Sequence, residues 1–167
     1  MNIGRSISIG GILTAIAVLL QSAPVFLPAI GLALSPLSTI PIAIAAIFNI
    51  SLGFSVFLSS ALILTIISVQ ETIILIFTTG LLGILVGSLL YRKGILTSIL
   101  FSSIALSLGM MFLTYIISIS AFTDLTHSLS MPLTYLIFLL FSLIYSSIWN
   151  FCFRILINYL IKIKLIS

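Results

Sequence analysis

The chain has 167 residues, of which 62% are hydrophobic and only 5% are charged, and its formal net charge is +4. Its mean hydropathy is +1.49. A soluble domain carries about 25% charged residues, so this composition excludes a water-soluble globular protein. One bilayer crossing takes about 20 helical residues, so the chain is long enough for six crossings but not for an added soluble catalytic domain. The six Lys and Arg residues form no patch, and we expect no nucleic acid partner.

Backbone polar groups inside a bilayer must be satisfied internally, and the sequence has no long alternating strands. The predicted fold is therefore all-α: a single polytopic transmembrane domain over residues 1–167, built as a six-helix bundle. The helices are expected at about 6–22, 32–48, 52–68, 73–91, 95–121 and 132–154.

Proline and polar residues set the expected boundaries along the chain. The first helix is expected to end before the Pro-rich segment 23–28. Pro36 and Pro41 lie inside the next apolar run and predict a kink or a short irregular segment there. The segment 69–72 is expected to form a loop between the third and fourth helices. The most polar segment, 123–128, predicts a loop before the sixth helix.

The charged residues test the helix count. With six helices, all basic residues fall on one side of the membrane: Arg5, Arg92, Lys93, Arg154, Lys162 and Lys164. Glu71 and Asp124 fall on the other side. Lys and Arg favour the cytoplasmic side, so both termini are predicted to be cytoplasmic.

Small residues recur at helical spacing on several of the expected helices. The fourth helix carries Gly80, Gly83 and Gly87, and the first carries Gly11 and Ala15. Such rows let helices approach closely in lipid. The sequence alone leaves open whether a given row packs inside the bundle or faces another protein.

Groups able to perform catalysis are scarce. The chain has one His, one Cys and two acidic residues. It contains no zinc-binding motif and no phosphate-binding loop. We therefore expect that it is not an enzyme and that it carries no cofactor and no metal.

Polar and aromatic residues gather instead on the side opposite the basic residues. Glu71, Asp124 and His127 are expected in loops there, with Tyr115 and Tyr135 about two turns deeper. Each is open to interpretation as a solvated loop residue or an interface aromatic. Together they predict a polar mouth that captures a small solute, with Glu71 or Asp124 pairing a cationic or amine group.

Four segments carry a resemblance to a known family: 10–20, 26–31, 35–43 and 79–87, the last followed by the basic pair 92–93. With these motifs the chain resembles the substrate-binding S-components of energy-coupling factor (ECF) vitamin transporters. Within that group it is similar to uncharacterised six-helix bacterial membrane proteins. The motifs cover about the first 95 residues, and the size and helix count match along the whole chain.

The resemblance implies a multi-pass subunit of the bacterial inner membrane that binds a vitamin or related micronutrient from outside. It would dock onto a transmembrane coupling subunit powered by ATPase subunits. The family docks through an A-x-x-x-A pair on the first helix, which Gly11 and Ala15 match here with glycine in the first place. The family's ligand lies near the outer face, which adds Phe26 to the substrate-binding candidates. The chain begins Met1-Asn2, unlike the Met-His of the nickel and cobalt members, which argues against a metal substrate.

Two other classes of function stay open. The protein could be a non-transport structural or assembly subunit of a membrane complex, in which case the small-residue rows are interfaces. It could also be an oligomeric proton-coupled exporter, which would require Glu71 to lie inside the bilayer.

Overall fold

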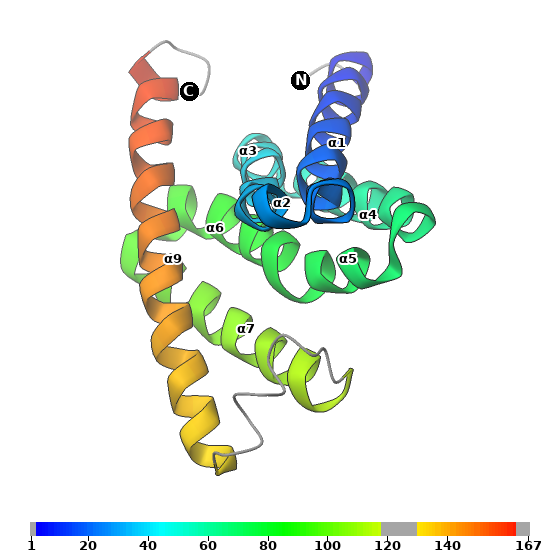
Figure 1. The fold of residues 1–167 in the computed structure, drawn as a ribbon. Helices are drawn as coiled ribbons and strands as arrows, with labels where there is room; N and C mark the ends of the chain where they lie inside the picture. Colours follow the sequence, from blue (N-terminus) through cyan, green and yellow to red (C-terminus); the bar gives the residue numbers. More distant parts are fainter. Residues whose placement is uncertain (1–2, 118–129, 163–167) are drawn as a thin grey trace.

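The computed structural model describes residues 3–117 and 130–162 (Figure 1). The described residues form helices and no strand, which confirms the all-α fold. Within the described ranges, six helical stretches are long and apolar enough to cross a membrane, which confirms the predicted six-helix bundle. These stretches are Gly4–Phe26, Pro28–Phe48, Ile50–Ile67, Val69–Leu90, Ile95–Tyr115 and Met131–Tyr159.

The first helix runs further than the sequence predicts. Helix α1 (Ile3–Phe26) continues through Pro24, which lies in its last turn and removes one backbone donor. The next helix, α2 (Pro28–Leu34), begins earlier than expected because proline is well tolerated in a first helical turn. Gly31 of α2 lies against the backbone of Ala23 and leaves no room for a side chain. α2 is therefore folded tightly against the end of α1.

The second span contains the irregular segment that its prolines predict. A 3-10 turn, η1 (Ser35–Ser38), includes Pro36 and connects α2 to α3 (Thr39–Phe48). Such short turns redirect a helix without opening its backbone to lipid. The prediction of an irregular segment here is confirmed.

Capping side chains make the next two connections very short. Asn49 precedes α4 (Ile50–Ile67), and its side-chain oxygen accepts a hydrogen bond from the Ser51 amide at 2.9 Å. Ser68 caps α5 (Val69–Ile74) in the same way, accepting from the Glu71 amide at 3.4 Å. The predicted loop at 69–72 is therefore wrong: the break is one residue long, and Glu71 belongs to the helix.

The fourth span is continuous but changes its winding. α5 leads into a π-helical turn, η2 (Leu75–Thr79), and then into α6 (Gly80–Lys93). Gly83 and Gly87 of α6 face α3, where an added Cβ at Gly83 would lie 3.0 Å from the Thr39 carbonyl oxygen. The glycine row of this span therefore packs inside the bundle.

The last two spans lie beside α6. α7 (Ile95–Tyr115) follows Gly94, whose positive φ of 93° makes the turn that a residue with a side chain would adopt only with strain. α7 ends earlier than the predicted residue 121. α9 (Met131–Lys162) is longer than predicted and packs along α7 and α6. In Figure 1 the start of α1 and the end of α9 lie at the same end of the molecule.

Two apolar clusters stabilise this arrangement. One joins α3, α6, α7 and α9 around Val86, Leu106 and Phe153. The other joins α1, α3, α4 and the fourth span around Ala17, Val56 and other side chains. Because α6 and η2 contribute to packing on both sides, the fourth span is the centre of the bundle.

Candidate solute-binding pocket

A buried polar cluster links the first, second and fourth spans around Gln21, whose side chain has no exposed surface. The Gln21 Oε1 atom accepts hydrogen bonds from Ser38 Oγ at 2.7 Å and from Thr79 Oγ1 at 2.9 Å. Gln21 Nε2 donates to Glu71 Oε2 at 2.9 Å. An ionised carboxylate only accepts hydrogen bonds, so the Gln21 amide nitrogen has to face Glu71. These contacts fix Gln21 in one orientation.

Glu71 is buried, with 7% of its surface exposed. The hydrogen bond from Gln21 is the only one that its side chain makes within the described residues, and it occupies a single carboxylate oxygen, Oε2. A buried carboxylate usually has further partners, because removing the charge from water is costly. The second oxygen, Oε1, is therefore available to a group that enters from outside the chain.

A pocket of about 320 Å³ borders Glu71. Its apolar walls come from α2, α5, α7 and α9 and include Leu32, Ile74, Leu106, Met110, Leu113 and Phe141. Its polar lining consists of Ser35, Gln70, Glu71, Thr78, Thr79 and Tyr145. The volume lies at the lower end of the range of about 300–1,000 Å³ for small-molecule sites, and a mainly apolar lining with a few polar groups is typical of them.

The π-helical turn η2 forms part of the pocket wall. Its Thr79 joins the Gln21 cluster, and Thr78 Oγ1 donates to the Ile74 carbonyl at 2.5 Å. Gly109 of α7 lies against the Phe77 carbonyl, where a side chain would not fit. This close approach packs α7 directly against η2, and both elements contribute residues to the pocket wall. Single π-helical turns occur frequently at functional sites.

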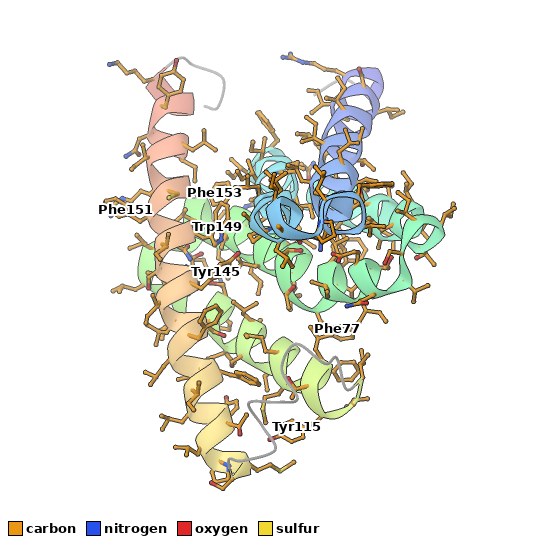
Figure 2. The ribbon with its side chains drawn as sticks, viewed as in Figure 1. Phe77, Tyr115, Tyr145, Trp149, Phe151 and Phe153 are labelled. Carbon is orange, nitrogen blue, oxygen red and sulfur yellow. The ribbon has the colours of Figure 1, made fainter. Side chains whose placement is uncertain are left out.

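A row of aromatic rings on α9 begins at the pocket. Phe141 and Tyr145 line it, with ring centroids 5.9 Å apart. The ring centroids of Tyr145 and Trp149 are 6.3 Å apart, and Trp149 stacks on Phe153 with centroids 5.6 Å apart. Figure 2 shows these three residues following one another along α9. The spacing of four residues keeps these rings on one face of the helix. The single Trp of the chain therefore contacts a residue of the pocket wall.

The structure separates the residues that the sequence groups into a mouth. Glu71 lines the pocket, whereas Phe26, Tyr115 and Tyr135 do not. Phe26 is 69% exposed at the end of α1, and Tyr115 is exposed at the end of α7. Asp124 and His127 lie outside the described residues.

Sequence reasoning missed the partners of Glu71. Ser68 and Glu71 match the S-x-x-E capping box that marks the start of a helix, and this signal places Glu71 in a first turn rather than a loop. Gln21 stands out as an amide within an apolar helix, which is a signal for an intramembrane contact. Its pairing with Ser38 and Thr79 depends on tertiary packing and leaves no local trace.

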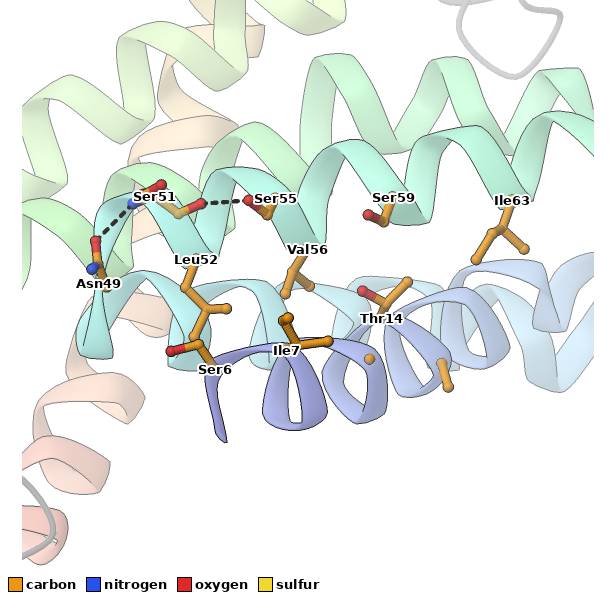
Figure 3. Close-up of a pocket in the computed structure, with 13 residues that line it drawn as sticks. Ser6, Ile7, Thr14, Asn49, Ser51, Leu52, Ser55, Val56, Ser59 and Ile63 are labelled. Atoms are coloured by element: carbon orange, nitrogen blue, oxygen red, sulfur yellow. Dashed lines mark hydrogen bonds between the residues drawn. The ribbon is translucent and has the colours of Figure 1, made fainter. Parts of the chain in front are cut away.

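The predicted docking residues line a second, larger hollow. A groove of about 660 Å³ lies between the first half of α1 and α4, along which it extends from Ser51 to Ile63 (Figure 3). Gly11 and Ala15 are exposed within it, and an added Cβ at Gly11 would have no neighbour within 4 Å. Ser51 and Ser55 line the opposite wall, where Ser55 Oγ donates to the Ser51 carbonyl at 2.9 Å.

A neutral polar cluster connects α7 to α9. The Ser102 hydroxyl pairs with the Ser146 hydroxyl, and Asn150 Nδ2 donates to the Ser146 carbonyl at 2.8 Å. Asn150 and Ser98 are fully buried, and their Oδ1 and Oγ atoms have no partner within the described part of the chain. These side chains therefore join α7 to α9 through hydrogen bonds between helices in apolar surroundings.

Within the residues that the structure describes, no group of three or more His, Cys, Asp or Glu side chains could hold a metal ion. Comparison of the chain with protein-family models, with curated proteins and with solved structures gives no significant match. The pocket beside Glu71 and the groove beside Gly11 are thus the two features from which a function can be argued.

Proposed function

We propose that this protein is the substrate-capture subunit of an ATP-driven micronutrient importer in the bacterial inner membrane. The observation that carries the proposal is the pocket of about 320 Å³ beside Glu71. If successive spans cross the membrane in opposite directions, this pocket lies in the half of the bundle away from Arg5, Arg92 and Lys93. That half is the predicted outer half. A solute would enter there from outside.

The pocket favours binding over chemistry. Its lining is mainly apolar, and the Glu71 carboxylate is already held by Gln21 before any ligand arrives. An anchor that is ordered in advance loses little conformational entropy when the ligand binds. The bundle thus supplies a prepared site, and the energy for transport would come from partner subunits.

The groove between α1 and α4 is the proposed docking surface for the coupling subunit. Gly11 and Ala15 are exposed in it, and small residues let a partner helix approach the backbone closely. On α1 the groove covers Ser6 to Ala15, the half of that helix that contains Arg5, and on α4 it extends from Ser51 to Ile63. This placement suits a coupling subunit whose ATPase subunits lie on the cytoplasmic side.

The proposal is tested by purifying the tagged protein from its native membrane and identifying bound small molecules and partner subunits by mass spectrometry. Leu32 is 70% exposed at the edge of the pocket, so Leu32→Trp should obstruct entry without straining the core. Ile66→Trp is the matched control, because Ile66 is 87% exposed and away from the pocket. We expect a bound solute in the parent protein and the control, and its loss in Leu32→Trp.

Recovery of the parent protein with no small molecule, no coupling subunit and no ATPase would contradict the proposal. That outcome would instead favour a structural or assembly subunit. In such a protein, Leu32→Trp would leave the set of recovered partner proteins unchanged.

One observation favours a second candidate, the proton-coupled exporter. Glu71 lies within the span Val69–Leu90 and is buried, as that function requires. Proteoliposomes that contain this protein alone separate the two functions. An importer subunit should move no solute in response to a pH gradient, whereas an exporter should do so and should lose that activity in Glu71→Gln.

A further inference from the structure

We infer that the ligand of the pocket is a small organic cation, with one ammonium or amidinium group bound to Glu71 and a compact apolar body. This inference rests on the proposed function, because it specifies the solute that the capture site takes. It follows from the charge, the shape and the hydrogen bonding of the pocket.

The first step concerns charge. Glu71 is buried in the fourth span, and its one hydrogen-bonding partner in the described residues, Gln21, is neutral. None of the described residues that line the pocket is Lys or Arg. An isolated buried carboxylate is unfavourable unless a positive charge accompanies it. A cationic ligand supplies that charge, whereas an anionic ligand would be repelled by it.

The second step concerns the direction of the hydrogen bond. Ser38 and Thr79 both donate to Gln21 Oε1, and turning the Gln21 amide would place its carbonyl against the Glu71 carboxylate, which cannot donate a hydrogen bond. The Gln21 amide therefore remains on Oε2 of Glu71. The free oxygen, Oε1, only accepts, and the ligand has to provide the donor. An N–H group that carries positive charge makes the strongest bond of this kind.

The third step concerns the body of the ligand. Leu106, Met110 and Leu113 of α7 form one wall, and Phe141 and Tyr145 of α9 form another. These side chains offer apolar and aromatic contact and few polar atoms. A compact ring or short hydrocarbon chain suits such walls, and the volume of about 320 Å³ excludes a large conjugate such as a dinucleotide.

The experiment uses the full-length protein in detergent micelles and three amine probes: phenethylamine, phenylpropylamine and cyclohexylmethylamine. Each amine is compared with its matched alcohol and its matched carboxylate. Trp149 fluorescence reports binding, because its ring contacts Tyr145 of the pocket wall. We expect saturable binding of at least one amine, binding of its alcohol that is weaker by about 30-fold or more, and no binding of its carboxylate.

Variants assign the binding to Glu71. Glu71→Gln keeps an acceptor for Gln21, so the fold should be retained, but it removes the charge and should weaken amine binding by about 30-fold or more. Thr65→Val is a similarly isosteric control on the exposed face of α4 and should leave the affinity unchanged. Melting temperature checks that each variant is folded. Asp124→Asn tests the second acid that the sequence suggests.

Several outcomes would overturn the inference: no amine binds, an alcohol binds as tightly as its amine, or Asp124→Asn weakens binding while Glu71→Gln does not. The proposed function would survive these outcomes if a neutral or anionic solute still co-purifies with the protein and is lost in Leu32→Trp. If no solute co-purifies and no probe binds, both proposals fail.

Discussion

The two buried polar clusters of this bundle differ in their charge and in what they border. The cluster around Gln21 contains a carboxylate and borders a pocket. The cluster of Ser102, Ser146 and Asn150 contains only neutral groups and fills the contact between α7 and α9. Both are surrounded by apolar side chains, yet only the first leaves an accepting oxygen next to a cavity.

This difference indicates how polar residues in a membrane helix divide between assembly and binding. Hydroxyl and amide groups join helices at modest energetic cost, because each can donate and accept within the interface. A carboxylate beside a cavity is more expensive to maintain and has no packing benefit of its own. Its presence next to the pocket is therefore better explained by a ligand than by helix assembly.

The largest expected effect comes from Gln21→Leu. This change leaves Ser38 and Thr79 without their acceptor and Glu71 without its donor, so we expect a loss of about 3–5 kcal/mol in the free energy of unfolding. Denaturant unfolding in detergent micelles measures it. Gln70→Leu makes the same substitution at an exposed position and should change stability by less than about 0.5 kcal/mol. Equal losses of stability in the two variants would show that the Gln21 cluster contributes no more to stability than an exposed glutamine does.

An intermediate effect is expected from Gly109→Ala. The new methyl group would collide with the Phe77 carbonyl, which forces α7 away from η2 and should cost about 1–3 kcal/mol. Because Met110 beside Gly109 and Thr78 beside Phe77 line the pocket, ligand affinity should fall together with stability. Gly11→Ala is the control, since its side chain meets open space. A stable Gly109→Ala protein with normal binding would show that this contact does not shape the pocket.

The smallest effect is expected from Asn150→Leu. Asn150 loses its hydrogen bonds to Ser146, but the change also removes a buried Oδ1 atom that has no partner in the described residues. We therefore expect destabilisation of about 0.6 kcal/mol, and normal ligand binding. Thermal unfolding measures it, with Asn158→Leu on the exposed side of α9 as the control. A loss as large as that of Gln21→Leu would mean that the two clusters do not differ as argued.

Much of the fold could be predicted from the sequence because it depends on long apolar runs and on the positions of a few charges. The structure confirms the six spans and the irregular segment at Pro36. The errors occur where one side chain ends or begins a helix. Ser68 caps a helix within a single residue, so a segment that its polarity marks as a loop is helical.

The pocket was harder to predict than the fold. Glu71 is recognisable as a rare charge, but its location depends on contacts with Gln21, which is 50 residues away in the chain. The pocket walls from α7 and α9 consist of Leu, Met and aromatic residues that look like any other lipid-facing or core residue in the sequence. Only tertiary packing distinguishes them.

The π-helical turn η2 has a consequence for how this protein tolerates insertions and deletions. It separates the segment that orients Glu71 from the segment whose glycines face α3, and it contains one more residue than an α-helical turn would need. Each residue of an α-helix turns the following side chains by about 100°. Deleting a single residue at 75–79 would keep the span apolar and long enough to cross the membrane. With the glycines still facing α3, however, the deletion would rotate Glu71 about the helix axis and turn its side chain away from Gln21. The geometry of this pocket therefore depends on the number of residues in the fourth span as much as on their types.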